Sequence, residues 1–206
     1  MKKKFYELCN KVEREGFQDL LAWLEGTDFF TAPASTRFHL ACEGGLLQHS
    51  LNVCECLLRK KSAPLWKDVL AEVPEESLII VSLLHDICKA NCYSVGYRNV
   101  KSYEKADVDA AAKWQVKTDE NGPFVWKSVP SYEFKDAYNL GHGEKSLYLA
   151  SRFIRLTDEE AFAIRWHMGF ADDSSHWSAI GDAFEKYPLS LALVEADLEA
   201  SKILEK

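Results

Sequence analysis

Apolar residues recur every three or four positions along most of the chain, which is the spacing that places them on one face of an α-helix. Glycine, proline and small polar residues interrupt this spacing and mark where each helix ends. The pattern predicts a mainly α-helical protein. The expected helices cover residues 4–15, 17–26, 43–60, 77–91, 142–154, 157–169, 177–185 and 188–203.

One of these segments, residues 77–91, is expected to form the centre of the core. Its first eight residues, SLIIVSLL, are almost all apolar, so no face of this helix suits water. A proline and two glutamates precede it, and these residue types are favoured at a helix N-terminus. We expect the helix to run on to Asn91, which is a better cap than Cys88.

Two helix ends carry specific signals. Gly44 and Gly45 open the helix over residues 43–60, and because glycine lowers helix propensity, they indicate a close approach of another backbone. Thr157 and Glu160 have the spacing of a capping box at the start of a later helix.

Residues 92–138 have a different pattern. The sequence YSVGYRNVK favours an extended chain, and two arms rich in Val, Trp and Phe flank the turn sequence Asp-Glu-Asn-Gly at 119–122. A short helix is expected over residues 106–114. The segment therefore predicts a small β-hairpin insertion on a helical body.

The composition fits one domain, residues 1–206, because about 150 residues is the usual domain size. The net charge of −7 argues against long nucleic acid as a partner, since that affinity depends on Lys and Arg, but it allows a small anionic substrate. No apolar run approaches the roughly 20 residues that span a bilayer. We expect a cytoplasmic protein without membrane contact, and the sequence leaves a homo-oligomer open.

The six cysteines are expected to be reduced, because the chain lacks the features of a short secreted protein. Their neighbours are apolar and helix-forming, which favours small buried side chains. The alternative is that Cys88 or Cys92 touches the functional site.

His85 and Asp86 follow the apolar helix directly, and burying such a pair is costly unless both groups have partners. A divalent cation satisfies imidazole nitrogen and carboxylate oxygen together. A histidine and an aspartate bonded to backbone at a helix end are the alternative.

Four further residues strengthen the metal hypothesis. Three histidines lie on other predicted helices, and an aspartate without an evident partner lies among apolar residues of the last one. All could share one core. These residues are His49, His142, His167 and Asp197.

The order of a histidine, an adjacent His-Asp pair and a distant aspartate resembles the HD superfamily of metal-dependent phosphohydrolases. The local sequences FHLACEGGLLQHSLNV and LLHDICK look like the HD domain of bacterial 3′-to-5′ exoribonucleases that also carry an OB-fold. The resemblance covers about residues 39–202. It excludes the β insertion, and this chain has no OB-fold to hold a strand.

The resemblance implies an HD-domain helical bundle in which His49, His85, Asp86 and Asp197 bind one metal. In HD proteins with extra histidines, the aspartate of the pair bridges to a second metal, and His142 and His167 fit those positions. Contact with substrate or a place in the core are the alternatives for these two histidines. Mixed His and carboxylate ligands favour Mn, Fe, Co, Ni or Zn.

Further roles follow from the same resemblance or from position. Several HD enzymes have a lysine at the place of Lys89 that contacts the scissile phosphate, so Asp86 and Lys89 are the expected catalytic residues. Lys145 is a candidate for binding phosphate, with a solvated lysine as the alternative for both Lys89 and Lys145, and His39 is a candidate for binding substrate or for supporting the metal ligands. Arg37 is a weaker candidate, and His176 is expected in a surface loop.

The function implied is hydrolysis of a phosphomonoester or phosphodiester, with a nucleotide as the expected substrate. Two alternatives remain. A mixed-valent diiron site of the HD fold would catalyse an oxygen-dependent cleavage, and a non-catalytic module would bind a metal or a nucleotide without turnover.

Overall fold

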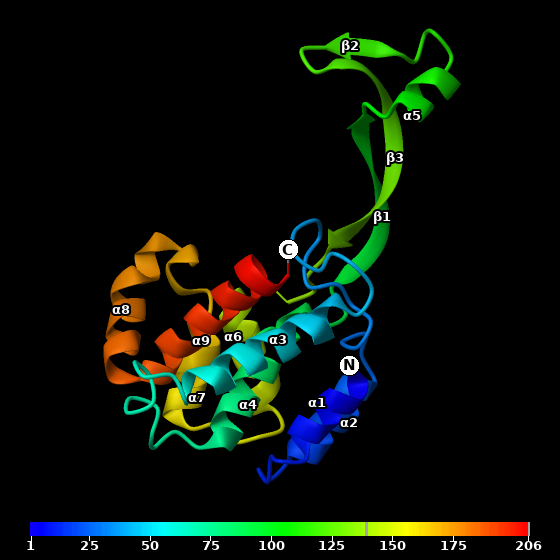
Figure 1. Cartoon of the computed structure of the whole chain (residues 1–206). Helices are drawn as coiled ribbons and strands as arrows, with labels where there is room; N and C mark the ends of the chain where they lie inside the picture. Colours follow the sequence, from blue (N-terminus) through cyan, green and yellow to red (C-terminus); the bar gives the residue numbers. More distant parts are fainter. Residues whose placement is uncertain (139, 206) are drawn as a thin grey trace.

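A computed structural model describes residues 1–138 and 140–205 of the chain, and these are mainly α-helical. A body of helices forms the larger part, and a twisted β-ribbon projects from it (Figure 1). The helices are α1 (Lys2–Cys9), α2 (Phe17–Glu25), α3 (Gly45–Lys60), α4 (Glu75–Leu84), α5 (Lys105–Ala110), α6 (His142–Ser151), α7 (Asp158–Arg165), α8 (Trp177–Lys186) and α9 (Pro188–Glu199), the last followed by a π-helical turn (Ala200–Leu204).

Helix α4 is the centre of the body, as its sequence predicts. Every residue from Ser77 to Leu84 is buried, and α4 packs against α3, α7 and α9. The hydroxyl of Ser82 donates to the carbonyl of Leu78 at 2.7 Å, so a polar residue is accommodated inside the apolar helix. The body is therefore built around one helix that has no solvent face.

The first helix is shorter than predicted: α1 ends at Cys9 instead of residue 15. Beyond it, Lys11 bonds to Glu75 at 2.8 Å and the backbone N–H of Glu13 donates to Glu76 at 2.8 Å. These contacts with the start of α4 hold residues 11–13 in a conformation that does not continue helix α1. Local spacing could not reveal this competition.

The prediction of one helix over residues 77–91 is also wrong in its second half. Helix α4 ends at Leu84, residues 85 and 86 turn, and a 3₁₀ turn covers Ile87–Lys89. Asn91 does adopt the left-handed backbone of a cap, with a φ of 59°. It exchanges backbone-to-side-chain hydrogen bonds with Asp28, which ties this end to the loop after α2.

The predicted β insertion is confirmed. Strands β1 (Tyr93–Ser102) and β3 (Gly122–Phe134) pair antiparallel from Tyr93↔Phe134 to Ser102↔Val125, and β2 (Lys117–Asp119) pairs with the start of β3 across the predicted turn. The sheet order is β1-β3-β2. Helix α5 is shorter than expected, ending at Ala110 instead of residue 114. The ribbon tip has its own small core around Phe124 and Val125.

Thr157 and Glu160 form the predicted capping box. All six cysteines are free thiols, and all except Cys42 are buried, so Cys42 is not the small buried side chain that we expected. Within the described ranges, no helix combines the length and apolar character needed to cross a lipid bilayer.

A buried ion pair joins the N-terminal segment to the body. The guanidinium of Arg14 donates to both oxygens of Glu160 at 2.9 and 3.0 Å, and Ser77 donates to the same carboxylate at 2.7 Å. Burial by itself raises the pKa of Glu160, but the hydrogen bonds from Arg14 and from the backbone of Thr157 outweigh it and hold this pKa below its ordinary value.

We expect Arg14→Ala to lower the free energy of unfolding by about 3 kcal/mol at pH 7, because the buried Glu160 carboxylate loses its bidentate partner. The lowered pKa of Glu160 gives stability that is present above the unfolded-state pKa of about 4.3 and is lost as the pH falls through the folded-state pKa. Urea unfolding should therefore show that the difference between wild type and variant narrows below about pH 4.

The matched control is Lys11→Ala, which breaks the exposed pair between Lys11 and Glu75. Exposed pairs contribute about 1 kcal/mol or less, so this variant should stay close to wild type at every pH. An equally small loss for Arg14→Ala would show that the buried pair does not stabilise the fold.

Candidate metal centre

The structure brings all six predicted ligands together from five separate segments of the chain. Four positions are at helix ends or in the turns that follow them, and two are within helices. His49 lies in α3, His85 and Asp86 follow α4, His142 begins α6, His167 follows α7 and Asp197 lies in α9. His167 is therefore in a turn and not, as predicted, on a helix.

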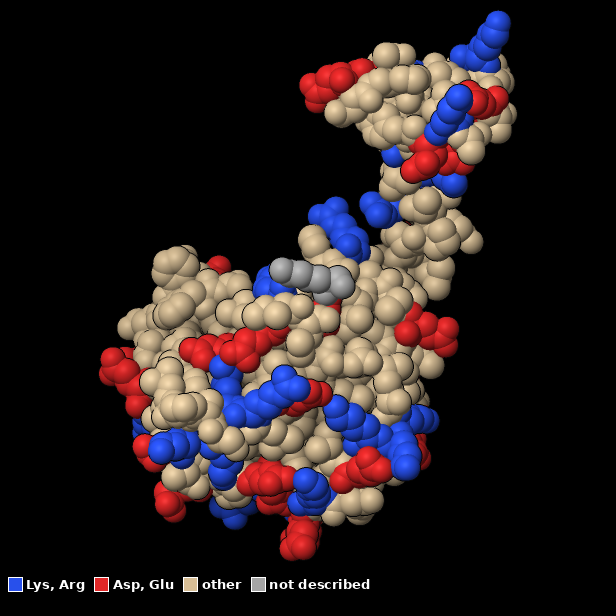
Figure 2. Space-filling view, in the orientation of Figure 1, with Lys and Arg blue, Asp and Glu red and all other residues tan. Residues whose placement is uncertain are grey.

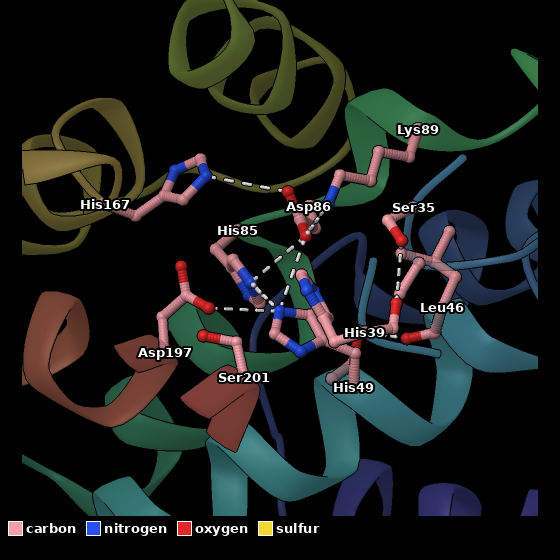
Figure 3. A network of polar contacts seen from close by, with 12 residues as sticks. Ser35, His39, Leu46, His49, His85, Asp86, Lys89, His167, Asp197 and Ser201 are labelled. Atoms are coloured by element: carbon pink, nitrogen blue, oxygen red, sulfur yellow. Dashed lines mark hydrogen bonds and ion pairs between the residues drawn. The ribbon is translucent and has the colours of Figure 1, made fainter. Parts of the chain in front are cut away.

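Three side chains form the first cluster, which Figure 3 shows from close by. Nε2 of His49 lies 3.3 Å from Nε2 of His85 and 3.2 Å from Oδ1 of Asp197. These atoms are close enough for all three residues to ligate one ion.

Asp86 lies between this cluster and two further histidines. Its Oδ2 is 3.4 Å from Nε2 of His85 and 3.6 Å from Nε2 of His49. Its Oδ1 is 2.9 Å from Nε2 of His142 and 3.6 Å from Nε2 of His167. Each oxygen of one buried carboxylate therefore faces its own pair of imidazoles.

The opposite nitrogen of three of these rings has a hydrogen-bond acceptor. Nδ1 of His49 lies 3.0 Å from Oε1 of Glu205, and Nδ1 of His85 and of His167 each lie 2.8 Å from a backbone carbonyl, of Ser82 and Ile164. Because a carbonyl only accepts, Nδ1 of His85 and His167 must carry the hydrogen. Such partners orient histidine ligands in metal sites and leave Nε2 free to bind.

These side chains fit a divalent metal. The Nε2 atoms of His49, His85 and His167 converge on carboxylate oxygens, so a positive charge, either a proton or a metal ion, has to lie between them. Nε2 of His167 is buried and has no hydrogen-bond partner among the described residues. Imidazole and carboxylate together suit Mn, Fe, Co, Ni or Zn better than Mg or Ca.

Local electrostatics keeps the carboxylates ionised. Burial disfavours the charged form of His49, but hydrogen bonds to Asp197 and Glu205 outweigh it and raise the pKa of His49 to about 9. Burial also disfavours the ionised form of Asp197, which by itself would raise the pKa of this carboxyl. The hydrogen bond with His49 outweighs burial and lowers the pKa of Asp197 to about 2. The pKa of Asp86 is held well below its usual range, despite burial, chiefly by the charge of Lys89.

Gly45 explains how the loop before α3 reaches the cluster. A Cβ at Gly45 would lie 2.0 Å from the carbonyl oxygen of Leu40, so only glycine allows this approach. The close approach predicted from the two glycines is thereby confirmed. It places the ring of His39 against that of His49, with centroids 5.0 Å apart.

Gly143 plays the same part between α6 and α7. A Cβ there would lie 2.0 Å from the carbonyl oxygen of Arg165, so the start of α6 can touch the end of α7. This contact sets His142 and His167, which are 25 positions apart in the chain, with ring centroids 5.6 Å apart.

A cavity of ≈ 590 Å³ opens above the cluster, and most of the predicted site residues line it. Lys89 lines it and bonds to Oδ2 of Asp86 at 2.7 Å. His39 lines it too, and burial lowers the pKa of His39. The cavity also includes Tyr93 and Phe134 from the foot of the ribbon.

Two other candidates, Lys145 and the weaker Arg37, lie outside this cavity. The ammonium of Lys145 is buried and bonds to Asp136 at 2.6 Å and to Cys92 at 3.1 Å, so it is already paired. His176 ends a surface 3₁₀ turn near Asp172, as expected of a loop residue. Arg37 lines a separate pocket nearby.

Two neighbours of the cluster were not predicted as part of it. Glu205 accepts from His49 and Asn52, and it lies eight residues after Asp197, about two helical turns further on the same side. That spacing is the signal that could have identified it. Cys88, considered only as an alternative, has its Sγ 3.5 Å from Nδ1 of His142.

Comparison of the chain with protein-family models, with curated proteins and with solved structures gives no match. The chemistry of the cluster therefore has to be inferred from its own geometry.

We expect the purified protein to carry two transition-metal ions per chain, because Asp86 offers one oxygen to each pair of histidines. Elemental analysis measures this ratio. The double variant His142→Ala, His167→Ala should retain about one ion, since the other histidine pair and Asp197 remain. His176→Ala, which changes a histidine outside the cluster, should retain two. A ratio of one in the wild type would contradict the second site.

Glu205→Gln tests the partner of His49. Replacing the carboxylate weakens the acceptor that orients the ring, so we expect metal affinity to fall by about tenfold or more in a chelator competition. The control is Glu199→Gln, whose carboxylate pairs with Lys60 and not with a histidine. Equal affinities for both variants would show that Glu205 does not support the metal.

Proposed function

We propose that the protein is a metal-dependent phosphohydrolase of the HD type. The observation that carries this proposal is the single carboxylate of Asp86, which has two imidazoles facing each of its oxygens. The residues on which the resemblance rests, from His49 to Asp197, are the same residues that converge in space. That agreement supports the HD interpretation, because ordinary packing alone does not favour so many buried histidines around one aspartate.

The cavity supports a small phosphorylated substrate, for which we propose a nucleotide. Its volume of ≈ 590 Å³ lies in the range that small-molecule sites occupy. Lys89 adds a cation beside the cluster, and Tyr93 and Phe134 add aromatic surface. A nucleotide would fit this cavity with its phosphate toward the histidine and aspartate cluster and its flat base against Tyr93 and Phe134.

Bound metal ions would supply an activated water and would neutralise charge on the phosphate. The chain itself positions the substrate and the ligands. Lys89, whose ammonium lies 2.7 Å from Asp86 and which lines the cavity, would bind a phosphoryl oxygen. Glu205 and the carbonyls of Ser82 and Ile164 keep three imidazoles oriented. No side-chain nucleophile is required.

Hydrolysis of p-nitrophenyl phosphate, its diester and a panel of nucleotides tests the proposal on metal-loaded protein. Lys89→Met should retain metal but lose about 100-fold in kcat/KM, because one cation at the phosphate is removed. Lys186→Met, at an exposed site on α8, is the control and should match the wild type. Absence of turnover with every metal and every substrate would contradict the proposal.

The same experiment separates the alternatives. An iron-loaded protein that consumes oxygen and hydrolyses nothing would be a diiron oxygenase. Tight nucleotide binding without turnover would identify a non-catalytic module. The cytoplasmic location stays a prediction of the sequence.

A further inference from the structure

A second pocket lies beside the metal cavity. It has a volume of ≈ 310 Å³ and forms between the loop before α3 and the β-ribbon. Thr36 lines both this pocket and the metal cavity, so the two adjoin. We call it the arginine pocket, and its lining is Thr36, Arg37, Ala41, Val95, Arg98, Pro130, Ser131 and Tyr132.

The arginine pocket is cationic in a protein of net charge −7. Its two guanidiniums belong to Arg37 and Arg98, and no Asp or Glu among the described residues lines the pocket beside them. Guanidinium stays charged at every physiological pH. Figure 2 shows basic side chains in the angle between the ribbon and the body. The pocket therefore suits an anion.

One face of the ribbon connects the two pockets. Side chains at alternate positions of a strand share a face, so Tyr93 and Val95 lie on the same side of β1, opposite their partners Phe134 and Tyr132. The first pair lines the metal cavity and the second lines the arginine pocket. The two residue pairs are two positions apart along the strands, which corresponds to a distance of about 7 Å.

We propose that the arginine pocket binds a second phosphate of the substrate, so that the substrate is a dinucleotide or the end of a short oligonucleotide. This inference rests on the proposed function, because it places the reacting phosphate at the metal centre. A guanidinium group binds phosphate oxygens through its planar set of N–H donors, and aromatic side chains such as Tyr93 and Phe134 stack on bases without regard to sequence. The acidic charge of the whole chain argues against a longer strand.

Equilibrium binding tests the second site without requiring turnover. The probes are the 5′-phosphorylated dinucleotide pApA and AMP, titrated into full-length protein treated with a chelator. We expect pApA to bind about tenfold more tightly than AMP, because charge-assisted hydrogen bonds form at the second phosphate. Arg37→Met and Arg98→Met should each remove most of this advantage and leave AMP affinity unchanged.

Two control variants accompany these substitutions. Arg152→Met, which removes an arginine that follows α6 and lines neither pocket, should bind both probes as the wild type does. Arg98→Lys keeps the charge but loses the planar fork, so it should recover part of the affinity for pApA. Equal melting temperatures show that the variants fold.

The outcomes separate this inference from the proposed function. Equal losses for pApA and AMP, or no loss for either, would overturn the second site. Hydrolysis of pApA by metal-loaded protein that does not depend on Arg37 or Arg98 would also overturn it, and would leave the phosphohydrolase intact. Arginine-dependent binding of pApA without any hydrolysis would support the second site and reject the phosphohydrolase.

Discussion

The burial of one carboxylate determines how the rest of the site is built. Asp86 is 2% exposed, and an ionised carboxylate in that position costs far more free energy than a folded domain can spare unless positive or hydrogen-bonding partners surround it. Lys89 and the imidazoles on both sides supply those partners. Charge compensation is strongest where water is excluded, so positive charge beside Asp86 lowers this cost most effectively.

The helical body meets this requirement by placing side chains at helix ends. Helix α4 is buried from Ser77 to its C-terminal end at Leu84, so the turn that follows lies inside the molecule and carries His85 and Asp86. Two close backbone contacts, at Gly45 and Gly143, bring the other elements up to it. Because packed helices hold these turns, the side chains of the cluster are positioned without support from a flexible loop.

The β-ribbon adds to the site what the helical body lacks. Its first residue pair contributes aromatic surface to the metal cavity, and its next positions help to form the arginine pocket. A two-stranded ribbon is only marginally stable alone, so its long pairing and the small core at its tip matter for holding these residues in place.

The helical body, the ribbon with its turn and the six clustered residues were all predictable from the sequence, because they depend on local spacing, turn chemistry and motif order. Tertiary structure alone decided that the first helix ends at Cys9 and that α4 ends before His85, since contacts with distant residues compete there with helix formation. It also decided that Lys145 pairs with Asp136 and that Glu205 supports His49. These side-chain contacts depend on which helices and strands pack together in the fold, and a local sequence pattern does not predict that packing.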